Sequence, residues 1–153
     1  MSEEAIKLIA GNRKARHEYH IEDTFEAGLV LRGTEVKSLR AGKANLQDGF
    51  CVFEAGHLLL RDIHISPYEH GTYNNHEPRR DRILLLNKRE LNKINKSVVR
   101  KGYTVIPLKL YFRNGKAKVL IGIAKGKRMY DKRDDIQKRD MDRKLDRIRK
   151  SVS

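Results

Sequence analysis

The segment from Tyr103 to Lys125, YTVIPLKLYFRNGKAKVLIGIAK, restricts the fold of this chain more than any other part of its sequence. It holds two apolar runs joined by Asn114–Gly115, the signature of a two-residue type I′ turn between antiparallel strands. Such a turn fixes the register, because side chains alternate between the two faces of a strand. The predicted pairs are Phe112 with Ala117, Leu110 with Val119, Leu108 with Ile121, and Ile106 with Ile123. All are apolar, so this face is expected to line a core.

The other face of the same hairpin carries like charges. The register places Tyr111 opposite Lys118 and Arg113 opposite Lys116. Like charges that face each other across strands are destabilising. The pairing is therefore expected to be either a surface for phosphate or a flared, fully solvated end of the hairpin.

Shorter signals extend the β pattern on both sides of this hairpin. Residues 50–65 predict two strands around the turn Ala55–Gly56–His57, and residues 17–31 predict strand, turn and strand. A short helix is predicted from Thr34 to Gly42, and a longer one after Asn87, with Glu90 completing its capping box. Residues 66–82 hold two prolines and little periodicity, which predicts a long loop.

Together these elements predict a mainly β fold. Its form is an antiparallel β-barrel like the oligonucleotide-binding (OB) fold, with two or three short flanking helices and a conditionally helical C-terminal tail. Residues 1–124 are expected to form the barrel, of which 1–11 are a flexible N-terminus. Residues 125–153 are expected to be a basic tail that is disordered when free.

The charge of the chain points to a polyanionic partner. The net charge is +14, and residues 125–153 alone carry 12 Lys or Arg against 6 Asp or Glu. Such an excess favours nucleic acid or an anionic membrane surface, the alternative being a merely solubilising surface. No apolar run is long enough to span a bilayer, and Cys51 lies alone in an apolar run. We therefore expect a cytoplasmic protein with a buried thiol.

The tail has the spacing of a helix that forms on a partner. Met141, Leu145, Ile148 and Val152 would form one thin apolar stripe. Opposite charges recur four residues apart, as in Asp135–Arg139, Asp140–Lys144 and Asp146–Lys150. Each pair contributes only about 0.2–0.5 kcal/mol, so an isolated helix is marginal. The alternative is a permanently solvated tail.

No catalytic or metal-binding motif is evident in the sequence, and we expect no enzyme activity, cofactor or metal. His17 and His20 would lie on opposite faces of the predicted strand, which separates them as ligands. His64, His70 and His76 are expected at the surface or stacked on RNA. The acids Glu18, Glu22, Asp23 and Glu26 could bind Mg²⁺ in a nuclease, but beside a basic surface they more often orient arginines.

The segment NRKARHEYHI instead predicts RNA binding. It combines Arg13, Lys14 and Arg16 with the flat rings of His17 and Tyr19. Cations that contact phosphates, interleaved with rings that stack on bases, are typical of proteins that hold folded or single-stranded RNA.

Several stretches, taken together, resemble one family. NRKARHEY, FEAGLVLRGTEVKSLRAGKANLQDG, HEPRRDRILLLNKREL, GYTVIPLKLYFRNGKAKV and IAKGKRMYDKRDDIQKRD follow the order and spacing of small protein B (SmpB), the tmRNA- or SsrA-binding proteins of bacterial trans-translation. The resemblance runs from Asn12 to about Arg149. It implies an OB-like barrel whose C-terminal tail is unstructured in solution.

The resemblance also implies partners. Members bind the tRNA-like domain of tmRNA and bring it, with elongation factor Tu, to 70S ribosomes stalled on mRNA without a stop codon. The tail enters the empty mRNA channel and becomes helical near the 16S rRNA decoding centre. A monomer is expected.

Matching positions imply site residues. Those that fall at tmRNA contacts of the family are Asn12, His17, Glu26, Leu85, Asn87 and Lys118, and Arg13, Lys14, Arg16 and Tyr19 accompany them. Those implied for the ribosome are Lys125, Gly126 as a hinge, Lys127, Tyr130, Asp131, Lys132 and Arg133. Two alternatives stay open, a structural ribosomal protein or general RNA chaperone, and an enzyme that acts on RNA.

Overall fold

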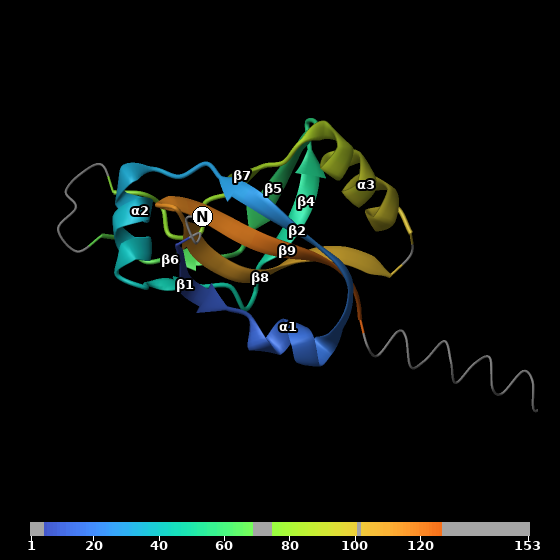
Figure 1. Ribbon diagram of the computed structural model, residues 1–153, viewed down its shortest axis with the longest axis horizontal. Coiled ribbons are helices and arrows are strands. Elements are labelled where there is room, and N and C mark those ends of the chain that lie inside the picture. The colour runs from blue at the N-terminus through green and yellow to red at the C-terminus, as the bar shows by residue number, and fades with distance from the viewer. Residues whose placement is uncertain (1–4, 69–74, 101, 127–153) are drawn as a thin grey trace, which may run out of the picture.

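A computed structural model describes residues 5–68, 75–100 and 102–126 of the chain. Strands predominate along these residues, with short helices between some of them (Figure 1). The strands are β1 (Ile6–Gly11), β2 (Tyr19–Leu29), β3 (Ala44–Asn45), β4 (Phe50–Glu54), β5 (His57–Arg61), β6 (His64–Ile65), β7 (Arg82–Leu85), β8 (Tyr103–Arg113) and β9 (Lys116–Gly126). The helices are α1 (Arg13–Glu18), α2 (Gly33–Arg40) and α3 (Lys88–Val98).

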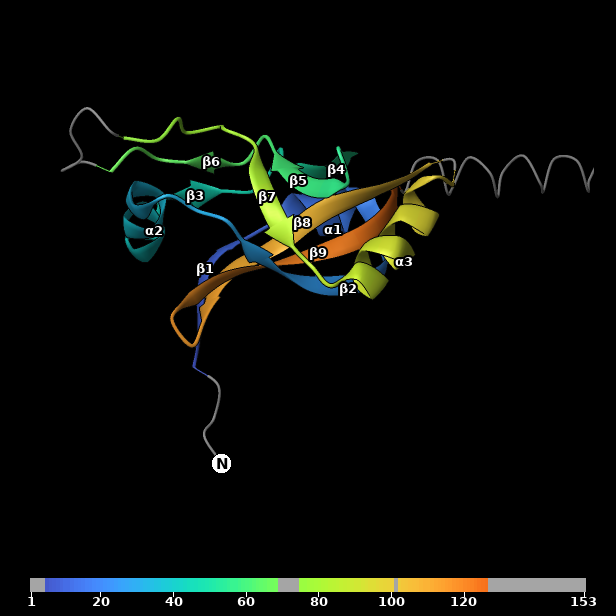
Figure 2. The ribbon, with the colours of Figure 1, turned by 90° about the horizontal axis from the view of Figure 1, so that it is seen from above.

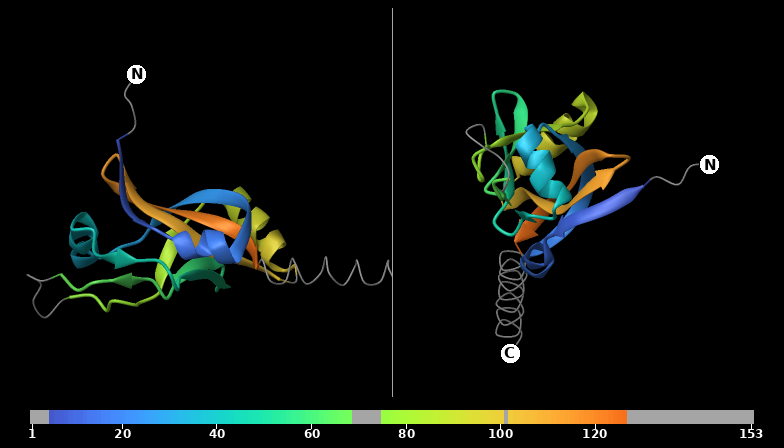
Figure 3. Two further views of the ribbon diagram at one scale, coloured as in Figure 1. Left: turned by 90° about the horizontal axis from the view of Figure 1, so that it is seen from below. Right: turned by 90° about the vertical axis from the view of Figure 1, so that its left-hand side faces the viewer.

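The long strands close into an antiparallel barrel. Neighbours follow the order β8-β4-β5-β7-β2-β9, and β9 pairs back onto β8 to complete the ring (Figure 3). Strand β1 extends the sheet from β8, and β3 pairs with β6 in a small separate sheet. The prediction of a mainly β, barrel-like fold with short flanking helices is confirmed. The predicted tail helix lies outside the described residues.

The β8–β9 hairpin confirms the predicted turn but only part of the predicted register. Asn114 and Gly115 have φ values of 51° and 79°, as a type I′ turn requires. Phe112 faces Ala117 and Leu110 faces Val119 as predicted. The register then shifts at Leu108, an extra residue on β8. Beyond it, Pro107 rather than Leu108 faces Ile121, and Val105 rather than Ile106 faces Ile123.

This β-bulge divides the side chains of β8 between two apolar clusters. Val105 joins Leu110 in the main core inside the barrel. Ile106 and Leu108 turn to the outside and pack with Ala15 of α1 and Ala124 of β9. The run from Val105 to Leu108 is apolar at every position because both of its faces are buried. The prediction assumed strict alternation, which a bulge interrupts.

A second bulge lies across β9 at the same level. The pairing of β2 with β9 shifts between Ile21 and Asp23, and Gly122 of β9 lies between the two bulges. A Cβ atom on Gly122 would lie 2.9 Å from Leu108 Cδ1 and 3.0 Å from Ile21 Cγ2. Two bulges around a glycine are a common way to bend a sheet sharply, and here they form a corner of the barrel.

Three predictions about the ends of elements are corrected. Residues 1–11 were expected to be flexible, but Ile6–Gly11 form β1 and pair with β8. The strand predicted to begin at His17 begins at Tyr19, because His17 and Glu18 form the last turn of α1. Lys125 and Gly126 were expected to begin the tail, but β9 continues through both, and they face His20 and Tyr19 of β2.

The remaining helix and turn predictions hold. Ala55 and Gly56 both have positive φ in the β4–β5 turn. Asn87 Oδ1 accepts a hydrogen bond from the Glu90 backbone N–H at 2.8 Å, and Glu90 accepts one from Asn87, which forms the predicted capping box of α3. Helix α2 begins one residue before Thr34, with Arg32 at its N-cap. Cys51 is buried, and burial raises the pKa of its thiol.

A buried ion cluster joins α2 to β7 and to the loop before it. The Glu35 carboxylate is fully buried and accepts hydrogen bonds from Arg80 and from Arg82, which is also fully buried. Arg82 donates further to the carbonyl oxygens of Ile63 and Pro78, at 3.1 and 3.0 Å. The cluster therefore fixes the path of the chain into β7.

His76 lies beside this cluster and is also buried, unlike the surface position expected from the sequence. Its Nε2 lies 2.8 Å from the Ile65 carbonyl oxygen, which can only accept, so Nε2 carries the proton. Its Nδ1 then accepts from Thr34 Oγ1 at 2.8 Å. The imidazole therefore connects α2 to β6.

We expect Glu35→Gln to lower the free energy of unfolding by about 3 kcal/mol or more at neutral pH, because it leaves the buried Arg82 charge without a counterion. Burial alone would raise the pKa of Glu35, but the hydrogen bonds from Arg80, the Arg32 backbone and Arg82 outweigh it and lower that pKa. A carboxylate with a lowered folded-state pKa stabilises the protein above its unfolded-state pKa, and the effect is lost as pH falls through the folded-state value. Protonation of Glu35 should therefore lower the stability of the wild-type protein below about pH 4.5, and this contribution should be absent from the variant.

Urea unfolding at several pH values measures both effects. The matched control is Glu54→Gln, because Glu54 is an exposed ion-pair partner of Arg61 and its loss should cost less than about 1 kcal/mol. Equal losses for the two variants would contradict a special role for the buried cluster.

Candidate nucleic-acid interface

Helix α1 presents a basic surface because its N-cap residue, Asn12, is bound to the barrel through its side chain. The Asn12 side chain is buried and caps the helix by accepting from the Ala15 backbone N–H at 3.2 Å. Its amide group donates to the carbonyl oxygens of Pro107 at 2.9 Å and Leu46 at 3.3 Å. Ala15 points into the second apolar cluster. These contacts turn the remaining side chains of α1 outward.

The exposed basic and imidazole side chains of α1 form what we call the α1 patch, Arg13, Lys14, Arg16 and His17, and the exposed Glu18 ends the helix beside them. Tyr19 follows directly and is half-buried at the start of β2. The patch has no acidic residue in the first turn of the helix. Since Gly126 faces Tyr19, the chain leaves β9 toward its C-terminal residues beside this patch.

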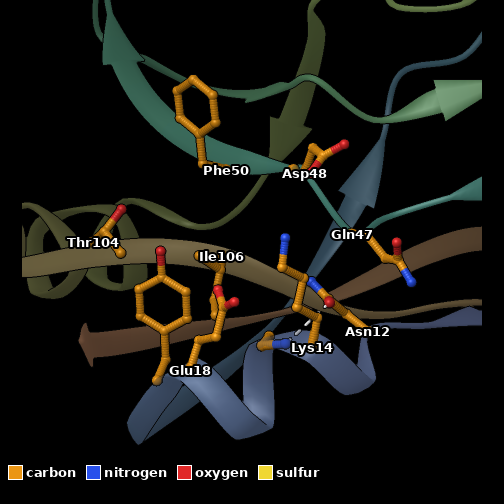
Figure 4. A pocket seen from close by; sticks show the side chains of 11 residues that line it. Asn12, Lys14, Glu18, Gln47, Asp48, Phe50, Thr104 and Ile106 are labelled. Atoms are coloured by element: carbon orange, nitrogen blue, oxygen red, sulfur yellow. Dashed lines mark hydrogen bonds between the residues drawn. The ribbon is translucent and has the colours of Figure 1, made fainter. Parts of the chain in front are cut away.

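A pocket of about 380 Å³ lies between α1 and the strands β4 and β8 (Figure 4). The gap arises because the described pairing of β4 with β8 is limited to Cys51 and Val105. Lys14 and Glu18 line it from α1, with Asp48 on the loop before β4. The pocket therefore offers hydrogen-bonding groups next to the α1 patch.

A second group of candidate residues lies at the far end of β2. Gly28 of β2 faces Leu85 on one side and Lys118 on the other, so the three lie in one row across β7, β2 and β9. Leu85 is 58% exposed, which is unusual for a leucine. We call Leu85 and Lys118 the β7–β9 patch. A Cβ on Gly28 would lie 3.3 Å from the Leu85 Cβ and 3.7 Å from Lys118 Nζ, so this glycine allows their close approach.

The other two residues predicted here have structural contacts of their own. Glu26 forms an ion pair with Arg113 across the outer face of the hairpin, which agrees with the expectation that acids orient arginines. Burial and then the Glu26 charge raise the pKa of Tyr111 nearby. Asn87 uses its side chain to cap α3.

The structure therefore divides six of the predicted tmRNA-contact residues between two patches. The α1 patch and the β7–β9 patch lie near opposite ends of β2, at most about 30 Å apart by the rise of an extended strand. Lys125 and Gly126 lie at the α1 end, with Lys125 Nζ 5.5 Å from the Tyr103 ring centre. Lys127, Tyr130, Asp131, Lys132 and Arg133 lie outside the described residues.

Helix α3 carries a third basic surface that the site prediction omitted. Arg89, Lys93 and Lys96 are exposed on α3, opposite the apolar residues Leu91, Ile94 and Val98, and the exposed Arg100 follows just beyond the end of the helix. Lys93 is bound to Asp23 at 3.3 Å and lies over the Phe25 ring. The signal was available in the sequence, because most residues of this segment outside the apolar stripe are Lys, Arg or Asn, and Glu90 is the one acid among residues 87–100.

Two absences hold for the described part of the chain. There, no three residues among the His, Cys, Asp and Glu side chains are grouped so that they could hold a metal ion. Within the same residues, none of the helices is both long and apolar enough to cross a membrane.

Comparison with known proteins places the chain in a family. A family model described as SmpB protein matches residues 9–151. An SsrA-binding protein of Pelotomaculum thermopropionicum is 58% identical over 94% of both chains. An SsrA-binding protein of Geobacillus sp. (strain WCH70) is 55% identical over 92% of this chain and 91% of the relative.

A solved structure agrees with the sequence comparisons. It is described as tmRNA-SmpB at the centre of the bacterial ribosome, and its matching chain is 53% identical, with a TM-score of 0.66. The match covers 76% of this chain and 82% of that one. By sequence over nearly its whole length and by fold, this chain belongs to the SmpB family.

Proposed function

We propose that this chain is an RNA-binding adaptor of trans-translation. It binds the tRNA-like domain of tmRNA and, with elongation factor Tu, brings it to 70S ribosomes stalled on mRNA that lacks a stop codon. The observation that carries this proposal is the α1 patch, four outward-facing basic or ring-bearing side chains held on a buried cap beside the point where the chain leaves the barrel. The protein acts as a monomer in the cytoplasm.

Two separated patches support binding to a folded RNA. Phosphate contacts from the α1 patch and from Lys118 would touch the same RNA near the two ends of β2, which are about 30 Å apart. That separation suits a compact, folded domain better than a single strand followed along one groove. His17, Tyr19 and Leu85 supply surfaces on which exposed bases can pack.

Three of the proposed contact residues mainly position other parts of the RNA-binding surface. Asn12 has all its polar atoms engaged within the barrel and therefore positions α1. Glu26 holds Arg113 over the hairpin, and Asn87 caps α3. The proposal assigns them to the arrangement of the RNA surface.

The residues beyond β9 are proposed to read the ribosome. Lys125 and Gly126 anchor the start of this segment in the barrel, so any hinge lies after Gly126. Lys127, Tyr130, Asp131, Lys132 and Arg133 are proposed to contact the 16S rRNA decoding centre and the empty mRNA channel. Tyr130 would stack on a base, and the charged residues would contact phosphates.

The double variant Arg13→Ala/Arg16→Ala should weaken binding to the tRNA-like fragment of tmRNA and make it less sensitive to salt. Each lost phosphate contact lowers the slope of log K against log salt concentration by about 0.7–0.9, so we expect a change of about 1.5. The α1 helix should persist, because alanine is the best helix former. Binding is measured from 50 to 300 mM salt, roughly the range in which counterion release dominates.

The control for this measurement is Lys7→Ala/Lys109→Ala, which removes two exposed charges outside both patches. If this control changes the slope as much as the α1 variant does, the binding reflects overall charge, as in a general RNA chaperone. Competition with ordinary tRNA gives the same distinction, because an adaptor for tmRNA should prefer tmRNA.

We expect Asn12→Ala to lower the free energy of unfolding by about 2 kcal/mol, since the helix cap is lost and two buried carbonyl groups lose a donor. Affinity for the tmRNA fragment should fall as α1 loses its position. Urea unfolding and a binding titration on the same samples test this. A variant of unchanged stability and weakened affinity would instead identify Asn12 as a direct RNA contact.

A chain that ends at Gly126 should bind the tmRNA fragment within about twofold of the full chain, because all described barrel pairs remain. It should fail to support transfer of the first tag residue on stalled ribosomes. A chain that ends at Ala124 loses two residues of β9 and should also melt at a lower temperature. Loss of fragment affinity in the chain ending at Gly126 would contradict this division between barrel and tail.

A further inference from the structure

The pocket between α1 and the strands β4 and β8 brings three charged side chains together. Lys14 and Glu18 lie four residues apart and therefore on the same face of α1. Asp48 lines the pocket from the opposite wall, and Figure 4 shows Lys14 and Glu18 reaching from α1 toward its loop. Among the described residues, none of the three side chains has a hydrogen-bond or ion-pair partner. They are therefore available to a ligand.

The two walls of this pocket are tied together beneath the charged side chains. The loop before β4 turns tightly, since the Gly49 N–H donates to the Leu46 carbonyl oxygen at 3.0 Å. The buried Asn12 donates to the same carbonyl oxygen at 3.3 Å and also caps α1. A Cβ atom on Gly49 would lie 2.5 Å from Ile63 Cγ2, so the loop packs closely onto the barrel. The position of the Asp48 backbone relative to α1 is thus set before any ligand binds, which lowers the cost of binding.

Ring-bearing and apolar side chains complete the lining of the pocket. Phe50 comes from β4 and Tyr19 from the start of β2, and both are half-buried. Phe50 belongs to neither apolar cluster of the core. The volume of about 380 Å³ lies at the lower end of the range of about 300–1,000 Å³ that is typical of small-molecule sites. Size and lining together suit one nucleobase taken out of a stack.

The place of the pocket on the barrel separates it from the β7–β9 patch. Helix α1 lies on the outside of β8, and β7 lies on the other side of the barrel (Figure 2). Arg13, Arg16 and His17 are exposed on the same helix as Lys14. An RNA whose phosphates contact these side chains would therefore bring its bases close to the pocket.

The polar groups of the pocket match the Watson–Crick edge of guanine. That edge presents two adjacent donors, N1–H and N2–H, beside the acceptor O6. A carboxylate can accept both donors at once, as it does from arginine, and a lysine can donate to O6. Adenine, cytosine and uracil each place an acceptor next to a single donor on this edge, so a lone pair would face one of the carboxylate oxygens. Guanine is therefore the base that the pocket should prefer.

The carboxylates also need a reason to lie within an RNA-binding surface. Of the described residues that line the pocket, only Glu18 and Asp48 are acidic. A carboxylate beside RNA repels phosphate and so weakens attraction that depends on charge alone. An acid that accepts hydrogen bonds from a base offsets this repulsion only for the base that offers the matching donors. The acids would thus make the basic surface selective.

We propose that this pocket binds one unpaired guanine of the RNA held by the α1 patch. The Asp48 carboxylate accepts from N1–H and N2–H, Lys14 donates to O6, and the base lies between the walls that carry Phe50 and Tyr19. We assign the contact to Asp48 because its turn is fixed and its short side chain loses little rotamer freedom. The inference rests on the proposed function, in which the tRNA-like domain of tmRNA supplies the base.

Short oligonucleotides test the base preference without a folded RNA. A pentanucleotide with guanine at the centre of four uridines should bind the full chain about tenfold tighter than the same pentanucleotide with adenine or cytosine there. Inosine in place of guanine lacks the N2 amino group and should bind about threefold to fivefold more weakly than guanine, because one of the two hydrogen bonds is lost. Fluorescence titrations at one salt concentration give these ratios.

The variant Asp48→Asn separates the pocket from general electrostatics. The change makes the protein more basic, so charge alone predicts tighter binding to every RNA. The pocket instead predicts about fivefold weaker binding of the guanine pentanucleotide, because an amide has one acceptor oxygen and turns an N–H toward the second donor. Asp48 is exposed, so the variant should keep the wild-type melting temperature.

The matched control is Asp62→Asn. Asp62 is exposed in the turn between β5 and β6, outside the pocket, and has a φ of 57°, which asparagine also adopts readily. The control removes the same charge as Asp48→Asn. It should therefore keep the guanine preference of the wild type.

The outcomes separate this inference from the proposed function. Guanine preference that is lost in Asp48→Asn and kept in Asp62→Asn supports the site, whereas equal affinity for all pentanucleotides or tighter binding of Asp48→Asn overturns it. Asp48→Asn should also weaken binding of the tRNA-like fragment by about threefold. An unchanged fragment affinity overturns the assignment of the guanine to that domain. Failure of the wild-type chain to prefer tmRNA to tRNA overturns the proposed function, while the pentanucleotide ratios still decide for or against the pocket.

Discussion

The bend in the β8–β9 hairpin is the constraint on which the rest of the structure depends. An extra residue at Leu108, a second bulge in β2 and the absence of a side chain at Gly122 bend the sheet at one level. The bend closes the barrel and also turns apolar side chains to its outside. Without them α1 would have no apolar surface to pack on, since Ala15 packs against that second cluster. The basic surface of α1 is therefore a consequence of how the barrel core is built.

Electrostatic interactions divide the surface of the protein by function. Glu35 and Arg82 form a buried ion pair. This pair fixes the path of the chain into β7 more than it adds net stability. Outside this buried pair, exposed cations gather on α1 and α3. This distribution concentrates the attraction for a polyanion on particular faces of the protein.

Local signals in the sequence were sufficient for several elements. The Asn114–Gly115 turn, the Asn87 capping box and the Ala55–Gly56 turn depend on a few neighbouring residues, and each formed as predicted. The excess of positive charge and the basic segment around Arg13 were likewise evident from the sequence alone. Only the tertiary structure decided where the strand register shifts, that residues 13–18 form a helix and that His76 is buried. These features arise from contacts between residues far apart in the chain, where packing on both faces of a strand competes with alternation, and no short sequence pattern records the outcome of that competition.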